Sequence, residues 1–145
     1  MAISLANLRG KIVSKVSALD GFNETRMSPA YFGRTQDTIA HLAFSVGMET
    51  STAATERQRR AIGVYVNSPI VVTFAYRLRP LDINLDYNNA MNSEQSVLSA
   101  VLGSYASDAG DSHFTIEYIS SIREVTDSQE YIIITLNFNT LHTLT

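Results

Sequence analysis

The chain has 145 residues, of which 45% are hydrophobic and 17% charged, and its formal net charge is −3. This length and composition predict one globular domain and argue against a chain that is disordered throughout. Because it has no cysteine, it cannot form a disulfide, a thiolate metal site or a cysteine nucleophile. No apolar run approaches the roughly 18 to 20 residues that cross a bilayer, and Asn7, Arg9 and Lys11 interrupt the N-terminal apolar run that a signal peptide needs. We therefore expect a soluble protein that is made in the cytoplasm and makes no membrane contact.

The first 48 residues predict a helix, a loop and a half-buried strand. A stripe of apolar residues at three- and four-residue steps predicts a helix over about residues 2–19. The stripe comprises Leu5, Leu8, Ile12, Val16 and Leu19. Asp20-Gly21 supplies the stop signal, and residues 21–36 are expected to form a loop. Over residues 38–48 apolar residues alternate with small or polar ones, which is the pattern of a strand with one buried face.

A polar arm and a long strand follow. Residues 49–61 are mostly polar or small and are expected to form a flexible arm, either an exposed loop or a hairpin. Alternation resumes over residues 62–66 and again over residues 72–78, on the two sides of Asn67-Ser68-Pro69. Because proline cannot donate a hydrogen bond to a neighbouring strand, we expect an edge position or a bulge at Pro69.

The next segment predicts a second helix, over about residues 84–103. Asp82 or Asp86 offers an N-cap, and acidic residues occupy the first turn, where the helix dipole favours them. Apolar residues then follow helical spacing up to Gly103, which gives the stop signal.

The C-terminal segment predicts a β-hairpin. Alternation from Phe114 predicts a strand with a bulge at Ser120-Ser121, and residues 126–129 have turn composition. The returning strand, residues 131–141, is strongly β-prone. One face of it is expected to carry Ile132, Ile134, Leu136 and Phe138.

These elements give the order αββαββ. That order predicts an α+β fold in which two helices pack on one face of a mostly antiparallel sheet. No linker or internal repeat divides the chain, so residues 1–145 are expected to form a single domain that includes the arm at residues 49–61.

Charge is sorted along the chain. Residues 1–80 contain ten Lys and Arg against five Asp and Glu, whereas residues 81–145 contain one against nine. Such sorting can give a subunit with unlike surfaces, which favours head-to-tail association into a ring or filament. The alternative is that the two halves interleave in the folded chain and the charges mix in space.

Catalytic signatures are missing from the sequence. It contains no glycine-rich phosphate loop, nucleophile elbow, zinc-protease helix or dinucleotide fingerprint. Asp111 and His113 could hold a metal ion, but two ligands at one spacing are weak support for such a site. We therefore expect no enzyme activity, no catalytic or metal-binding residues and no cofactor.

The candidate functional residues are charged side chains that could meet a neighbouring subunit or a central channel. Arg57, Arg59 and Arg60 lie in the polar arm, where they could pair with acids of another subunit, contact phosphates or remain in solvent. The pI of about 5.5 makes phosphate contact plausible only if assembly gathers these residues in one place. The full candidate set is Arg57, Arg59, Arg60, Arg77, Arg79, Asp82 and Asp86.

The order of elements across nearly the whole chain, and the appearance of the segment Val71–Leu102, resemble the tail terminator proteins of long-tailed bacteriophages. The strand ending in Tyr76-Arg77-Leu78-Arg79-Pro80 and the helix from Asp86 to Leu102 carry most of this resemblance. It implies a small virion subunit that forms a hexameric ring on the last ring of tail tube protein, stops polymerisation and binds the head-side connector protein. DNA would pass through the lumen without being read. Another neck connector or tail-completion subunit would look similar, and a small hydrolase or ligand-binding module is the remaining alternative.

Overall fold

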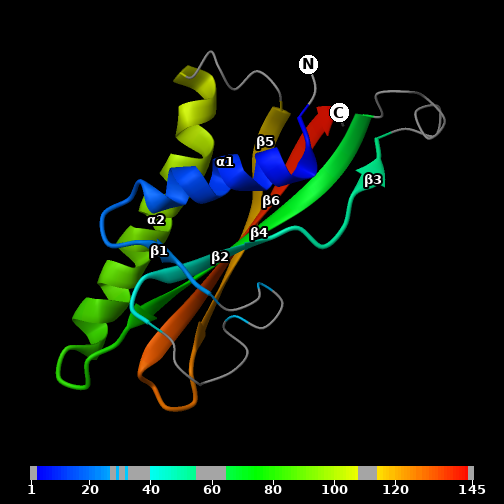
Figure 1. Cartoon of the computed structure of the whole chain (residues 1–145). Helices are drawn as coiled ribbons and strands as arrows, with labels where there is room; N and C mark the ends of the chain where they lie inside the picture. The colour runs from blue at the N-terminus through cyan, green and yellow to red at the C-terminus, as the bar shows by residue number, and fades with distance from the viewer. Residues whose placement is uncertain are drawn as a thin grey trace.

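The structure is a computed structural model that describes residues 3–26, 29, 32, 40–54, 65–107 and 114–143, the last five residues of the second helix by their backbone only (Figure 1). Its described elements are two helices and six strands. In chain order they are α1 (Leu5–Ser17), β1 (Asn23–Glu24), β2 (Ala43–Gly47), β3 (Thr52–Ala53), β4 (Tyr65–Arg77), α2 (Ile83–Ser107), β5 (Phe114–Val125) and β6 (Tyr131–Thr143).

The six strands form one mixed sheet. Its order is β1-β2-β4-β6-β5, with β3 pairing with β4 beside β2. The pair β1 and β2 is parallel, and every other pairing is antiparallel. The expected α+β class is confirmed, but the expected order αββαββ omits β1 and β3. Each of these strands has only two residues, too few to show a period-2 pattern in the sequence.

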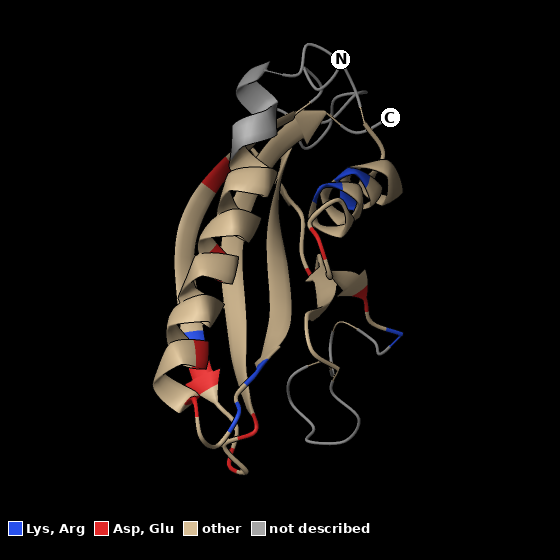
Figure 2. Ribbon diagram, turned by 90° about the vertical axis from the view of Figure 1, so that its left-hand side faces the viewer, with Lys and Arg blue, Asp and Glu red and all other residues tan. Residues whose placement is uncertain are grey.

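Both helices lie on the same face of the sheet and enclose the main core. Helix α1 packs against β2, and α2 packs against β5 and β6. Figure 2 shows α2 in front of the long strands and α1 nearly end-on. The apolar stripe of α1 is buried at Leu8, Ile12 and Val16. These residues pack in one cluster with the inward side chains of β6, namely Ile132, Ile134, Leu136 and Phe138. The predicted inner face of β6 is therefore confirmed.

The opposite face of the sheet carries a smaller apolar cluster. Ala75 and Ile133 lie there with Ala43 and Phe32, and Tyr131 packs against them. Further along this face β6 carries the polar residues Thr135, Asn137 and Asn139. The sheet thus separates a large core under the helices from a smaller cluster around Phe32 on the other face.

The long strands β4 and β6 pair without interruption over 13 residues each, from Tyr65 opposite Thr143 to Arg77 opposite Tyr131. The bulge expected at Pro69 is therefore wrong. Pro69 lies opposite Asn139, between the residues of β4 that pair with β3 and those that pair with β2. On that side of β4 no described strand faces Pro69, which explains how an inner strand accommodates a residue with no N–H group.

Several boundaries and the position of the bulge differ from the sequence predictions. Helix α1 is shorter than expected and begins after Ser4, whose hydroxyl accepts a hydrogen bond from the N–H of Asn7. Helix α2 continues past Gly103 to Ser107, because a glycine inside a helix costs only about 1 kcal/mol relative to alanine and does not end it. The bulge in β5 lies between Tyr118 and Ser120, slightly before the expected position.

Candidate functional site

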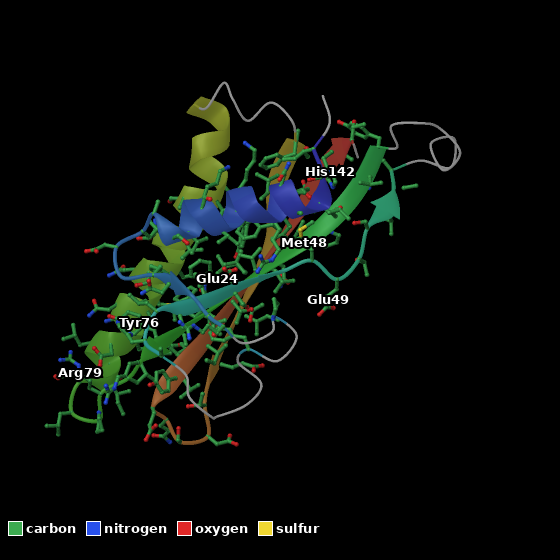
Figure 3. All side chains as sticks on the ribbon, in the orientation of Figure 1. Glu24, Met48, Glu49, Tyr76, Arg79 and His142 are labelled. Atoms are coloured by element: carbon green, nitrogen blue, oxygen red, sulfur yellow. The ribbon has the colours of Figure 1, made fainter. Side chains whose placement is uncertain are left out.

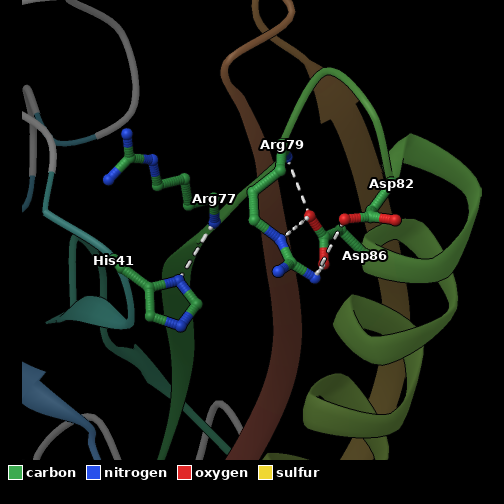
Figure 4. A network of polar contacts seen from close by, with 5 residues as sticks. All are labelled: His41, Arg77, Arg79, Asp82 and Asp86. Atoms are coloured by element: carbon green, nitrogen blue, oxygen red, sulfur yellow. Dashed lines mark hydrogen bonds and ion pairs between the residues drawn. The ribbon is translucent and has the colours of Figure 1, made fainter.

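The structure brings four of the seven candidate residues together, where β4 ends and α2 begins (Figure 4). Arg77 is the last residue of β4, Arg79 and Asp82 lie in the connection, and Asp86 lies in the first turn of α2. Figure 3 places Arg79 and Tyr76 at this end of the molecule, far from His142. The other three candidates, Arg57, Arg59 and Arg60, lie outside the described residues, as do Asp111 and His113.

Arg79 and Asp86 form the centre of this site. The backbone N–H of Arg79 donates to Asp86 Oδ2 at 2.8 Å, its Nε donates to the same oxygen at 3.0 Å, and its Nη2 donates to Oδ1 at 3.0 Å. The Asp86 side chain is only 4% exposed, whereas Arg79 remains open to solvent on its outer side. A bidentate arginine–carboxylate pair fixes both groups in one geometry. The connection between β4 and α2 is therefore held in one conformation.

The ion pair shifts the protonation equilibria of both groups in the expected directions. The hydrogen bonds from the Arg79 side chain, and then from its backbone, hold the pKa of Asp86 below its usual value. In return, the hydrogen bond to Asp86 raises the pKa of Arg79. Asp82, whose Oδ2 lies 3.7 Å from Arg79 Nη2, adds a weaker contact at the exposed side. Asp86 is thus engaged within the subunit, while Asp82 faces outward.

His41 lies next to this ion pair and anchors the end of β4. Its Nδ1 accepts a hydrogen bond from the backbone N–H of Arg77 at 3.1 Å, and its ring stacks edge-on against Tyr76 with 4.6 Å between the ring centroids. Burial is the main cause that lowers the pKa of His41. The neutral ring can accept this bond at Nδ1, which the doubly protonated ring cannot. Within the described residues the Arg77 guanidinium makes no ion pair, so it is available to a partner.

The anchored connection presents apolar side chains to solvent. Leu81 is 97% exposed, and Leu85, one helical turn further on, is 54% exposed. The backbone N–H of Leu78 donates to the carbonyl of Glu130 at 2.7 Å, which ties the connection to the turn of the β5–β6 hairpin. Single exposed leucines are common on protein surfaces, so Leu81 is informative only in combination with the fixed charged residues of the same connection. The sequence pattern did not identify Leu81.

Two further ion pairs were not anticipated, because their partners are far apart in the sequence. Arg9 Nη2 contacts Glu24 Oε2 at 2.7 Å, and Arg9 Nε donates to the carbonyl of Val46. Arg123 makes a bidentate contact with Glu94 at 2.7 and 2.6 Å, which links β5 to α2. The only sequence signal for the second pair is that Arg123 is the single cation among nine acids after residue 80.

A buried polar chain lies at the opposite end of the sheet. Ser68 Oγ lies 2.8 Å from both Ser51 Oγ and His142 Nε2. His142 is almost completely buried, its Nδ1 has no hydrogen-bond partner within the described residues, and burial lowers its pKa. Because Ser68 is buried too, its hydroxyl is not open to a substrate and is not placed to act as a nucleophile. It connects β3, β4 and β6.

The sheet face opposite the helices contains a groove of about 640 Å³. Its polar lining includes Arg9, Glu49 and Glu124, and its apolar lining includes Phe32 and Ile133. The Arg9 guanidinium is already engaged by Glu24. Within the described part of the chain, no group of three His, Asp or Glu side chains is placed to hold a metal ion.

Comparison of the sequence with protein-family models and with curated proteins finds no match. Among the described helices, neither is both long and apolar enough to cross a membrane.

Proposed function

We propose that this chain is a structural subunit of a bacteriophage virion, a tail terminator that forms a ring on the end of the tail tube, with six copies as the resemblance implies. In this role it stops tube polymerisation and offers its other surface to the head-side connector protein. DNA passes through the lumen without sequence recognition, and the subunit carries out no chemical reaction.

The observation that carries this proposal is the fixed, exposed end formed by the connection between β4 and α2. The Arg79–Asp86 pair holds the loop in place, and the same loop carries the exposed Leu81 and the exposed charged side chains of Arg79 and Asp82. An apolar anchor surrounded by charges is the composition of a protein contact surface. Preorganisation of such a surface lowers the entropy lost on binding.

The charge distribution gives independent support. Residues 3–26, which form α1 and β1, include four Lys and Arg, of which Lys15 has its Nζ buried over the Phe114 ring, and two Asp and Glu. Residues 114–130, which form β5 and the hairpin turn, include one Arg and four Asp and Glu. In Figure 2 Lys and Arg positions lie on α1, and an acidic position lies on the edge strand of the sheet. Unlike sides of one subunit are suited to a closed ring of identical copies.

The first test is the mass of the purified protein, alone and after mixing with tail tubes, by native mass spectrometry. The proposal expects a closed oligomer in at least one of these settings. A strict monomer in both would refute it.

The alternative, a different neck connector or a tail-completion subunit, is separated by depletion of the protein during infection. Loss of a terminator gives tails of excessive length, because nothing stops the tube. Tails of normal length that fail to join heads would instead assign the chain to the neck.

A further inference from the structure

We propose that residues 55–64 of one copy of this chain bind along the exposed edge of strand β5 in the next copy. The first surface is the basic segment, residues 55–64, and the second is the β5 stretch, residues 120–125. This inference rests on the proposed ring and adds which surfaces form its lateral contact.

The backbone of the β5 stretch is open on one side. Strand β5 is the last strand on its side of the sheet and pairs only with β6. An extended segment of another chain can add to such an edge through main-chain hydrogen bonds. The bulge between Tyr118 and Ser120 bends the edge. The longest regular stretch that ends at the hairpin turn is therefore Ser120–Val125.

Strand β5 also exposes large apolar side chains. They are Tyr118, Ile119, Ile122 and Val125, of which Ile119 and Ile122 are exposed by 57% and 52%. A single exposed isoleucine needs no explanation, but four large apolar side chains on one 12-residue edge strand indicate a surface that a partner covers.

The charges beside the β5 stretch are acidic. Glu124 lies in the stretch, and Asp127 and Glu130 follow in the hairpin turn. All three are exposed, and none of them makes an ion pair within the described part of the chain. The neighbouring cation, Arg123, is already held by Glu94 at 2.6 Å. Three unpaired carboxylates around an apolar edge favour a partner that is extended, apolar and cationic.

The basic segment has this composition. Its sequence contains Arg57, Arg59 and Arg60 against the single acid Glu56, so its net charge is +2, and it continues into Ile62 and Val64. Three arginines within four residues are the densest group of cations in the sequence. The cations of α1 do not offer such a group, because Arg9 pairs with Glu24 and the Nζ atom of Lys15 is buried over the Phe114 ring.

The basic segment lies outside the described residues, but the structure fixes the position of its two ends. The backbone N–H of Ala54 donates to the carbonyl of Tyr65 at 2.8 Å, so the ten residues between them leave and return at one point. Five residues out and five back reach at most about 17 Å from this point.

The β5 stretch of the same copy is beyond this reach. Tyr65 lies opposite Thr143 of β6, whereas Ser120 lies opposite Asn137, six residues further along β6. Six residues of a strand span about 20 Å. In addition, β3 and β5 lie on opposite sides of the long strands β4 and β6, as Figure 1 shows. The basic segment therefore meets the β5 stretch of a second copy. Because the two surfaces are different, the contact can repeat head-to-tail until a ring closes.

A charge swap tests the pairing of the two surfaces. Arg57→Glu, Arg59→Glu and Arg60→Glu together reverse the basic segment, and Glu124→Lys, Asp127→Lys and Glu130→Lys together reverse the acids. We expect each triple variant to weaken self-association about tenfold at low salt, measured by sedimentation in the setting where the wild-type protein assembles. The six substitutions combined keep the wild-type net charge and should restore most of the affinity. A combined variant that stays as weak as either triple variant would overturn the inference.

A pair of single variants controls for net charge and for folding. Glu124→Lys and Glu117→Lys make the same change in charge at exposed residues of β5, the first in the β5 stretch and the second on the other side of the bulge. Circular dichroism checks that both proteins fold. Glu124→Lys should weaken self-association more than Glu117→Lys, and equal effects would contradict the assignment of the contact to the β5 stretch.

Cross-linking then tests the geometry, and the absence of native cysteine makes each introduced thiol unique. Gln58→Cys marks the basic segment, Ile122→Cys marks the β5 stretch, and Thr115→Cys marks the other, equally exposed part of β5. With a short bismaleimide, a mixture of Gln58→Cys and Ile122→Cys should give covalent dimers, whereas Gln58→Cys with Thr115→Cys should give few. Efficient cross-linking of Gln58→Cys with itself, or of Ile122→Cys with the tail tube protein, would assign these surfaces to other contacts and overturn the inference.

The outcomes separate this inference from the proposed function. A ring by native mass spectrometry without cross-linking between the two surfaces would refute this contact and leave the proposed function standing. Cross-linked particles that stop at two copies would keep the contact and refute the ring. A protein that stays monomeric alone and with tail tubes would refute both.

Discussion

The same substitution at two isoleucines should separate folding from assembly. Ile134, on β6, is fully buried in the main core, whereas Ile122, on β5, is 52% exposed. Ile→Ala removes three carbon groups, each worth about 0.8 kcal/mol of transfer free energy when buried. At Ile134 this gives about 2.4 kcal/mol, and the cavity left between the helices and the sheet raises the expected loss to about 2–5 kcal/mol.

Because Ile122 is about half exposed in the folded monomer, its truncation loses only about half of that transfer free energy and leaves no cavity. The expected loss of unfolding free energy is therefore at most about 1 kcal/mol. If Ile122 lies in the contact between copies, Ile122→Ala should nevertheless weaken self-association, which Ile134→Ala affects only through folding.

The assay is urea denaturation followed by far-ultraviolet circular dichroism, since the chain has no tryptophan for fluorescence. It should be run at a protein concentration too low for self-association, and the association of folded protein should be measured separately by sedimentation. Equal losses of stability for the two variants would refute the burial argument. An Ile122→Ala protein that associates normally would show that this exposed side chain takes no part in self-association.

Other substitutions examine single features of the fold. Asp86→Asn should lower the melting temperature, because it removes the charge that binds the arginine side chain, whereas Asp82→Asn should have a much smaller effect; equal effects would contradict the special role of Asp86. The pKa of His142 is lowered in the folded state. Below about pH 6.5, the pKa of an unperturbed histidine, the unfolded chain therefore binds more protons than the folded one, and the stability decreases as the pH is lowered. His142→Gln should reduce this slope in pH-dependent denaturation, and an unchanged slope would exclude His142 as its source. Gly21 has a φ of +83° and a Cβ there would lie 3.1 Å from a leucine methyl group, so Gly21→Ala should cost about 1–2 kcal/mol. Gly10 has open space within α1, and Gly10→Ala should instead stabilise by about 0.5–1 kcal/mol; the same sign at both glycines would contradict the backbone argument.

Sequence reasoning succeeded where one face of an element is buried over several turns or pleats. The stripe of Leu8, Ile12 and Val16 predicted the buried face of α1, and alternation predicted which side of β6 faces the helices. In both elements the apolar side chains recur with the period of the backbone, so the local sequence shows which face is buried.

Sequence reasoning failed where a structural feature depends on contacts between segments that are far apart in the chain. The place of Pro69 between two short pairings depends on where β2 and β3 dock against β4, which no local pattern records. The four candidate residues near α2 were named for their charge, but the capture of Asp86 by Arg79 within one subunit became visible only in three dimensions. The exposed Leu81 has no periodic signal, because it lies between two elements.

The position of β6 has a consequence for biosynthesis. It is the final strand along the described chain, yet it lies between β4 and β5 and supplies much of the inner core. While the ribosome is still making residues 131–143, β5 has no partner, and the apolar side chains of β4 have no cover from β6. The nascent polypeptide therefore completes this sheet only after residues 131–143 have been synthesised, and until then it is a natural client for chaperones that shield apolar, unpaired strands.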